Sequence, residues 1–168
     1  PEGRTQLVEA GVAALAGRTR HAHYGRVLGR LLRRSAGETP GPLRVLEVGG
    51  GNRFLTREIL PFLVDAGIEY WFTDVSRAFI DGARRWAAEA GYPQLKFGVL
   101  DISRDTRAQG WSVMFDAVIG LDVVHATRDI EATLRQLRTL IAPGGSLHLV
   151  ETLPPARWNT MVWGVAED

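Results

Sequence analysis

The sequence contains no cysteine, only one lysine and no long apolar run. The absence of cysteine and the absence of a long apolar run each exclude several classes of protein or site. Without cysteine there is no disulfide framework, no thiolate metal site and no cysteine nucleophile. No apolar stretch approaches the roughly 18 residues of a membrane span, and no segment resembles a signal peptide. The 20 basic and 19 acidic residues give a net charge of +1, so there is no basic surplus for a nucleic acid. We therefore expect a soluble, cytoplasmic protein that binds neither nucleic acid nor membrane.

The length and the order of the sequence patterns indicate one globular domain. The chain has 168 residues, of which 45% are hydrophobic, and this is enough for one ordinary core. Because it does not begin with methionine, we expect a domain cut from something longer. An Ala-rich helix is predicted around residues 4–16 and an amphipathic helix over 21–34, followed by a Gly- and Pro-rich linker over 35–42. We accordingly assign residues 1–42 to an N-terminal helical segment with its linker, and residues 43–168 to the core.

From residue 43 onward, short apolar runs alternate with helical patterns. The predicted strands cover residues 44–49, 69–74, 95–100, 115–121 and 146–151, and the predicted helices cover residues 53–66, 76–90 and 128–141. This alternation implies parallel strands joined by right-handed crossovers. The expected fold is therefore α/β, with a mostly parallel, doubly wound, Rossmann-like sheet.

Several boundaries of these elements carry recognisable residues. Ser76 and Thr127 are expected to cap the helices that follow them, and Gly91 is expected to end one. Pro143-Gly144-Gly145 predicts a turn into the last strand. Because only 17 residues follow Glu151, any antiparallel strands after the fifth strand are expected to be short or missing.

Glycines and acids follow the predicted strands, where an open α/β sheet binds its ligands. Glu47, Gly49 and Gly51 form an acid and a glycine turn after the first strand, although such a turn is often only a tight connection. Asp74 ends the second strand, 23 residues after Gly51, and can accept both hydroxyls of a ribose or simply cap the next helix. Asp101 follows the third strand, where an adenine amino group could donate to it. Together the strand ends indicate a nucleotide-type ligand.

The kind of nucleotide follows from what stands next to the glycines. A dehydrogenase fingerprint needs a third glycine or an alanine where this chain has Phe54, and the chain has no P-loop sequence. An acid two residues before the first glycine, Glu47, suits a cationic amino-acid group such as that of S-adenosylmethionine.

These residues resemble class I methyltransferases, and within that family the methylating domains of polyketide synthases and related nonribosomal synthetases. The similarity covers about residues 43–152 and is most specific over residues 115–119, 124–130, 133–135 and 142–145. The stretch His-Ala-Thr-Arg-Asp, residues 125–129, is far more restrictive than a glycine loop.

The resemblance implies S-adenosylmethionine as the cofactor and assigns roles to individual residues. It places Glu47, Gly49 and Gly51 at the methionine end, Asp74 at the ribose and Asp101 beside the adenine. The predicted cofactor-binding set also includes Ile102 and Asp122.

The resemblance also implies that His125 and Glu151 act as a catalytic dyad. The residues support this pairing independently, because the ends of adjacent fourth and fifth strands point into the same crevice. Histidine can hold and release a proton near neutral pH, and a carboxylate would orient it and stabilise its cation.

The sequence departs from the family pattern at three places. Arg53 replaces the last glycine of the motif, so its side chain must swing outward or fill part of the pocket. Leu121-Asp122 replaces a small polar residue and asparagine, and the leading region is short for a substrate lid.

Two functions therefore remain open. One is methylation, at the α-carbon or the β-oxygen, of an acyl chain on an acyl carrier protein within a polyketide synthase. The other is an inactive pseudo-methyltransferase that braces neighbouring synthase domains.

Overall fold

The computed structural model describes residues 20–151. The predicted helix at 4–16 and any strand after residue 151 lie outside the described residues. The elements, in chain order, are α2 (Arg20–Glu38), β1 (Leu43–Val48), α3 (Phe54–Leu63), β2 (Ile68–Asp74), α4 (Arg77–Glu89), β3 (Lys96–Val99), β4 (Phe115–Leu121), the short 3-10 helix η1 (Val124–Ala126), α5 (Ile130–Thr139) and β5 (Ile141–Val150). No helix within this range is long and apolar enough to cross a membrane.

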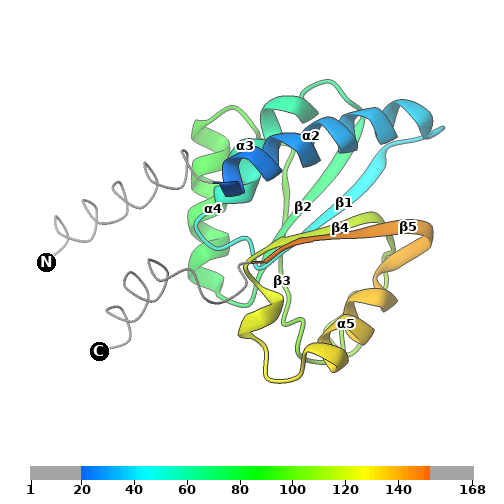
Figure 1. The fold of residues 1–168 in the computed structure, drawn as a ribbon. Helices are drawn as coiled ribbons and strands as arrows, with labels where there is room; N and C mark the ends of the chain where they lie inside the picture. The colour runs from blue at the N-terminus through cyan, green and yellow to red at the C-terminus, as the bar shows by residue number, and fades with distance from the viewer. Residues whose placement is uncertain (1–19, 152–168) are drawn as a thin grey trace, which may run out of the picture.

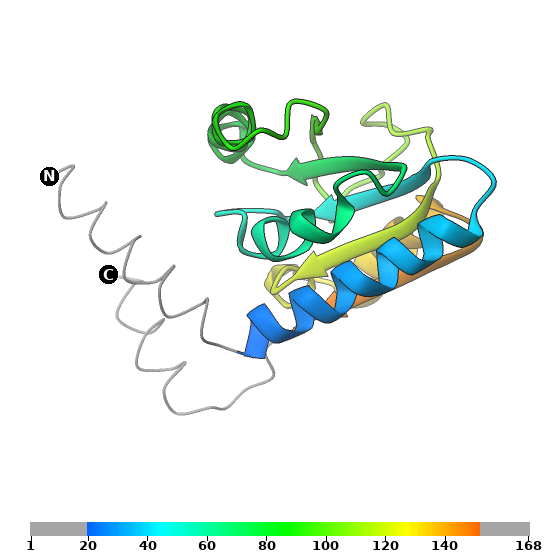
Figure 2. The same cartoon turned by 90° about the horizontal axis from the view of Figure 1, so that it is seen from above.

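The five strands form one all-parallel sheet in the order β3-β2-β1-β4-β5. Helices α2, α3 and α4 cover one face and α5 covers the other, so the sheet is doubly wound as predicted (Figure 1). Seen from above, α2 lies beside α3 over the sheet (Figure 2). The strand order reverses between β1 and β4, which is where such sheets open a crevice for a ligand.

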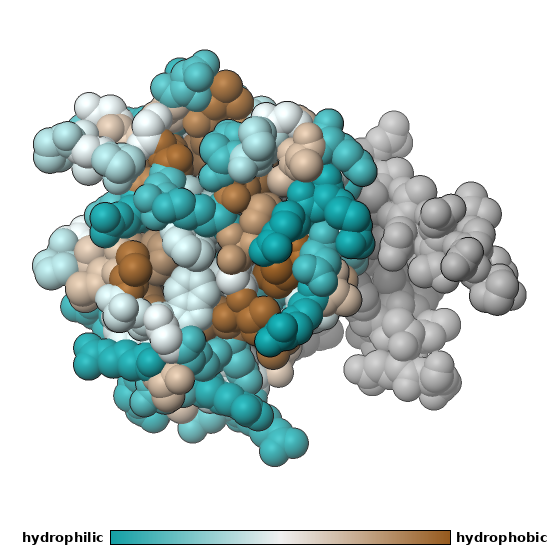
Figure 3. All heavy atoms as spheres, turned by 180° about the vertical axis from the view of Figure 1, so that it is seen from behind, coloured by the Kyte–Doolittle hydropathy of each residue, from teal (hydrophilic) through white to brown (hydrophobic). Residues whose placement is uncertain are grey.

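The core is divided between the two faces of the sheet. Val45 on β1 faces α2 and α3, whereas Leu46 faces α5, because successive side chains of a strand point to opposite faces. Both residues are fully buried, as expected for a parallel sheet covered on both faces. Seen from behind, the surface carries apolar groups scattered between hydrophilic ones (Figure 3).

Helix α2 is longer than the sequence predicted. It continues to Glu38, so that half of the predicted linker over 35–42 is helical. Leu28, Leu32 and Ala36 are all buried and continue one stripe at a spacing of four residues. This packing against α3 extends the helix into a segment whose glycines and prolines predicted a linker.

The last helix and the last strand of the described residues differ from the prediction in three details. Asp129, rather than Thr127, caps α5, and its side chain accepts a hydrogen bond from the Ala132 N–H at 2.8 Å. Strand β5 begins at Ile141, directly after α5, instead of at 146. The expected turn at 143–145 is an irregularity within β5, where Gly144 takes a positive φ. Ser76, by contrast, stands at the predicted N-cap of α4, and Gly91, which takes a positive φ, follows its end.

Candidate active site

A cavity of about 500 Å³ opens at the carboxyl edge of the sheet, at the point where the strand order reverses. Its walls come from the segments after β1, β2, β3 and β4 and from the first turn of α5. Five predicted cofactor residues are among those that line it, namely Gly49, Asp74, Asp101, Ile102 and Asp122. The lining also includes Thr127, Arg128, Asp129, Ala132 and Thr133, to which the sequence analysis assigned no cofactor-binding role.

Gly49 lets the turn after β1 approach the loop after β4. Its φ is +62°, and a Cβ at this position would lie 2.2 Å from Cγ2 of Val123. No L side chain fits into that distance, so the close approach requires glycine.

Asp74 holds the glycine turn to the end of β2. Its Oδ2 accepts the Gly51 N–H at 3.0 Å, and its Oδ1 accepts the Ser76 N–H at 2.8 Å. The carboxylate is buried but still lines the cavity. Whether it also accepts ribose hydroxyls stays a prediction.

Asp101 follows β3, the strand beside β2, and lines the same cavity. The Ser103 hydroxyl donates to its Oδ1 and lowers the pKa of the Asp101 carboxyl, and Arg104 forms an ion pair with its Oδ2 at 3.1 Å. Gln109 fixes the backbone of Asp101 by accepting its N–H at 2.8 Å and donating to its C=O at 2.9 Å. The segment after β3 therefore presents an ionised carboxylate in a fixed position.

Glu47 lies outside the cavity lining. Its side chain is only 1% exposed, and it accepts hydrogen bonds from the Thr56 hydroxyl at 2.6 Å and the Tyr70 hydroxyl at 2.7 Å. Burial raises the pKa of its carboxyl to about 7, although the two hydrogen bonds by themselves would lower that pKa. Its predicted role toward the methionine group of the cofactor stays a prediction.

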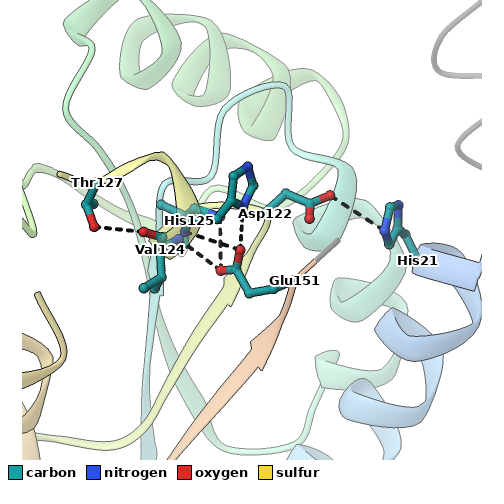
Figure 4. Close-up of polar contacts among 7 residues, drawn as sticks. His21, Asp122, Val124, His125, Thr127 and Glu151 are labelled. Carbon is teal, nitrogen blue, oxygen red and sulfur yellow. Dashed lines mark hydrogen bonds and ion pairs between the residues drawn. The ribbon is translucent and has the colours of Figure 1, made fainter. Parts of the chain in front are cut away.

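His125 and Glu151 come together as the topology predicts (Figure 4). His125 lies on η1 and Glu151 directly follows β5, yet His125 Nδ1 is 2.6 Å from Glu151 Oε2. Glu151 Oε1 also accepts the N–H groups of Val123 at 3.2 Å and Val124 at 2.9 Å. Burial alone would raise the pKa of the Glu151 carboxyl, but the hydrogen bonds from His125 and the backbone outweigh it and lower that pKa.

Asp122 joins this pair from the end of β4. It takes a left-handed conformation with φ +49°, and His21 Nε2 from the first turn of α2 lies 3.5 Å from its Oδ2. The sequence analysis assigned no role to His21. No local pattern connects it to the site, because the contact spans about a hundred residues of chain and depends on how α2 packs.

Arg53 turns away from the cavity. It precedes α3 in a left-handed conformation with φ +66°, and its Nη1 lies 3.2 Å from the place that a Cβ on Gly82 would take. Its guanidinium therefore lies against α4, and Arg53 is not among the residues that line the cavity. Arg53 therefore does not fill this cavity, and its effect on cofactor binding stays a prediction.

Comparison with known proteins identifies the family of this chain. The chain matches a family described as a methyltransferase domain over residues 46–147. It is 39% identical over 129 residues to the highly reducing polyketide synthase pspA of Penicillium soppii, which is 73% of this chain and 5% of that synthase. The chain thus spans about a twentieth of the length of the curated relatives that it matches.

Two solved structures are similar in both sequence and shape. The CurJ carbon methyltransferase is 30% identical with a TM-score of 0.81, over 92% of this chain and 42% of that one. The trans-methyltransferase CalH, in complex with SAH, is 34% identical with a TM-score of 0.73, over 84% of this chain and 40% of that one. The chain therefore belongs to the methyltransferase domain family, with a class I Rossmann-like fold and polyketide synthases as its relatives.

Proposed function

We propose that the chain methylates the α-carbon of a β-keto acyl thioester carried by an acyl carrier protein, using S-adenosylmethionine. The observation that carries this proposal is the contact of 2.6 Å between His125 Nδ1 and Glu151 Oε2, at the carboxyl edge of the sheet beside the cavity. A base held by a carboxylate next to a ligand cavity is suited to proton abstraction.

The cavity fits an adenosyl sulfonium ligand. Its volume of about 500 Å³ lies within the range of small-molecule sites. Asp74 and Asp101 are carboxylates on separate walls, suited to the ribose and the adenine amino group, and Gly49 lets the backbone come close. The CalH structure contains SAH, which supports the same class of cofactor here. When bound, the cofactor supplies an electrophilic methyl group on a positively charged sulfur.

The residues of the chain supply the base. A carboxylate against Nδ1 favours the tautomer in which Nδ1 carries the proton, so that Nε2 holds a free lone pair. Nε2 accepts the α proton of the thioester, and the electron pair of that C–H bond stays on the α-carbon. This carbon would then take the methyl group as the methyl–sulfur bond breaks and its electron pair returns to the sulfur, while Glu151 stabilises the imidazolium until its proton passes to solvent. Much of the rate comes from holding the carbon in line with the methyl group.

The acceptor is proposed to be carbon rather than oxygen. The CurJ protein is a carbon methyltransferase, and it is 30% identical over most of this chain. Methylation of a β-hydroxyl oxygen would use the same base and remains the competing reaction.

The partners follow from the relatives. These are multidomain synthases, so we propose neighbouring synthase domains and an acyl carrier protein as the partners of this chain in the cytoplasm.

A pseudo-methyltransferase is the second candidate, because Arg53 stands in a left-handed conformation where the family has glycine. Calorimetric titration with S-adenosylmethionine separates the two candidates. Measurable heat and a thermal shift are expected for the enzyme, and their absence would leave only the structural role.

His125→Ala tests the base in the same protein. We expect it to bind the cofactor with nearly unchanged affinity and to lose methyl transfer to a β-ketoacyl-pantetheine acceptor. Removing a general base costs about 10²- to 10⁴-fold in rate. Retained turnover would remove His125 from this role.

A further inference from the structure

Three side chains at the carboxyl edge of the sheet bring metal-binding atoms together. Asp122, His125 and Glu151 each offer one such atom, and these atoms all lie within 4.8 Å of one another (Figure 4). They come from three separate segments, the end of β4, η1 and the residue after β5. We propose that they form a site for a single divalent transition-metal ion such as Zn²⁺.

The donor set selects the kind of ion. One imidazole nitrogen with two carboxylate oxygens suits Zn²⁺ and Co²⁺, whereas Ca²⁺ and Mg²⁺ prefer oxygen ligands alone. Three protein ligands leave a fourth position for water, which is the arrangement of open zinc sites.

The distances require only a small adjustment. Zinc bonds to nitrogen and oxygen are about 2.0–2.2 Å long, which places tetrahedral ligands about 3.4 Å apart. Side-chain movements of about 1 Å therefore reach this spacing: separations of up to 4.8 Å must shorten, and His125 Nδ1 and Glu151 Oε2, now 2.6 Å apart, must move apart. His125 and Asp122 have room to rotate, because their side chains are 51% and 31% exposed.

The surroundings hold two of the ligands in place. Glu151 Oε1 accepts the N–H groups of Val123 and Val124, which leaves Oε2 directed at His125. His21 Nε2 lies 3.5 Å from Asp122 Oδ2 and so steadies the second carboxylate. Partners of this kind orient metal ligands, and their loss typically weakens metal binding by about 10- to 100-fold. His21 is therefore a positioning residue for the site.

Occupancy of the site inhibits methyl transfer, a consequence that rests on the proposed function. When the metal takes Nδ1 of a neutral imidazole, the remaining proton is on Nε2. Nε2 then has no lone pair with which to accept the α proton. The same ion occupies Oε2 of Glu151, so the carboxylate no longer stabilises an imidazolium.

The test is a titration of the chelator-treated chain with Co²⁺, followed by the visible absorption of the ion, and with Zn²⁺, followed by calorimetry. One ion per chain is expected. Asp122→Asn removes one ligand with little change of shape and is expected to weaken binding by at least about tenfold. Absence of binding, or unchanged binding by this variant, would overturn the site.

His21→Gln and His23→Gln form a matched pair on the first turn of α2. The first is expected to weaken Zn²⁺ binding by about 10- to 100-fold and to raise the inhibitory Zn²⁺ concentration by the same factor. The second, on an exposed histidine outside the group, is expected to change neither. Equal effects of the two variants would contradict the assignment.

Activity and binding are measured separately, so the two proposals can fail separately. Zn²⁺ bound at the site without loss of methyl transfer would overturn the inhibitory role. A chain with no methyl transfer at all would count against the proposed function, while the Co²⁺ and Zn²⁺ titrations would still decide the metal site.

Discussion

Glu47 and Glu151 are both carboxylates at the carboxyl edge of the sheet, yet the pKa of the first is raised and the pKa of the second is lowered. Glu47 is buried under α3 with two hydroxyl donors, and burial raises the pKa of its carboxyl to about 7. Glu151 is also partly buried, but His125 and backbone N–H groups lower its pKa. Two acids at strand ends of the same sheet therefore differ in the direction of their pKa shifts. The depth of burial and the number of hydrogen-bond donors around each carboxylate set the direction of its pKa shift.

The largest effect is expected from removing the charge of Glu151. Glu151→Gln keeps the shape but cannot stabilise a protonated His125, so methyl transfer should fall by about 100-fold or more. Calorimetry should show nearly unchanged affinity for S-adenosylmethionine. Wild-type turnover by this variant would show that methyl transfer does not depend on the charge of Glu151.

Cofactor binding should be lost when the glycine turn is filled. Gly49→Ala places a Cβ 2.2 Å from Val123 Cγ2 and imposes φ +62° on alanine, so we expect loss of cofactor affinity and about 1–3 kcal/mol of destabilisation. Adding Val123→Ala in the same chain removes the clash but not the backbone strain, and should recover part of both. If the single variant binds the cofactor normally, the turn does not form the cofactor site.

A change in the pH dependence of stability is expected from Glu47→Gln. Because the folded-state pKa of Glu47 is raised, folding favours its protonated form, and the contribution of Glu47 to stability is fully present below about pH 4.5 and is lost as the pH rises through about 7. The loss amounts to about 3 kcal/mol for this shift. Urea unfolding at several pH values should show this fall in the wild type relative to the variant. Parallel profiles would show that Glu47 is not perturbed.

The sequence predicted the fold well because its strongest signals are local. Alternating apolar runs and helical stripes located the described strands and helices of the core, and strand ends located Gly49, Asp74 and Asp101 beside one cavity. Boundaries were wrong where packing overrides propensity. Helix α2 extends through residues 35–38, and β5 starts before the Gly-rich segment that suggested a turn.

The site was predicted less completely, and for a different reason. His125 and Glu151 could be paired because neighbouring parallel strands end at one edge. His21 could not be placed, since its contact with Asp122 depends on the packing of α2. The direction of the Arg53 side chain likewise depends on the space beside Gly82, which no local pattern encodes.

The most direct measurement of the central claim is hydrogen exchange at the α-carbon of a β-ketoacyl-pantetheine in D₂O, followed by NMR without methyl transfer. The wild-type chain is predicted to exchange this proton well above the rate in buffer, and both His125→Ala and Glu151→Gln are predicted to lose most of that excess. Exchange no faster than in buffer, or exchange that survives His125→Ala, would contradict the assignment of His125 as the base.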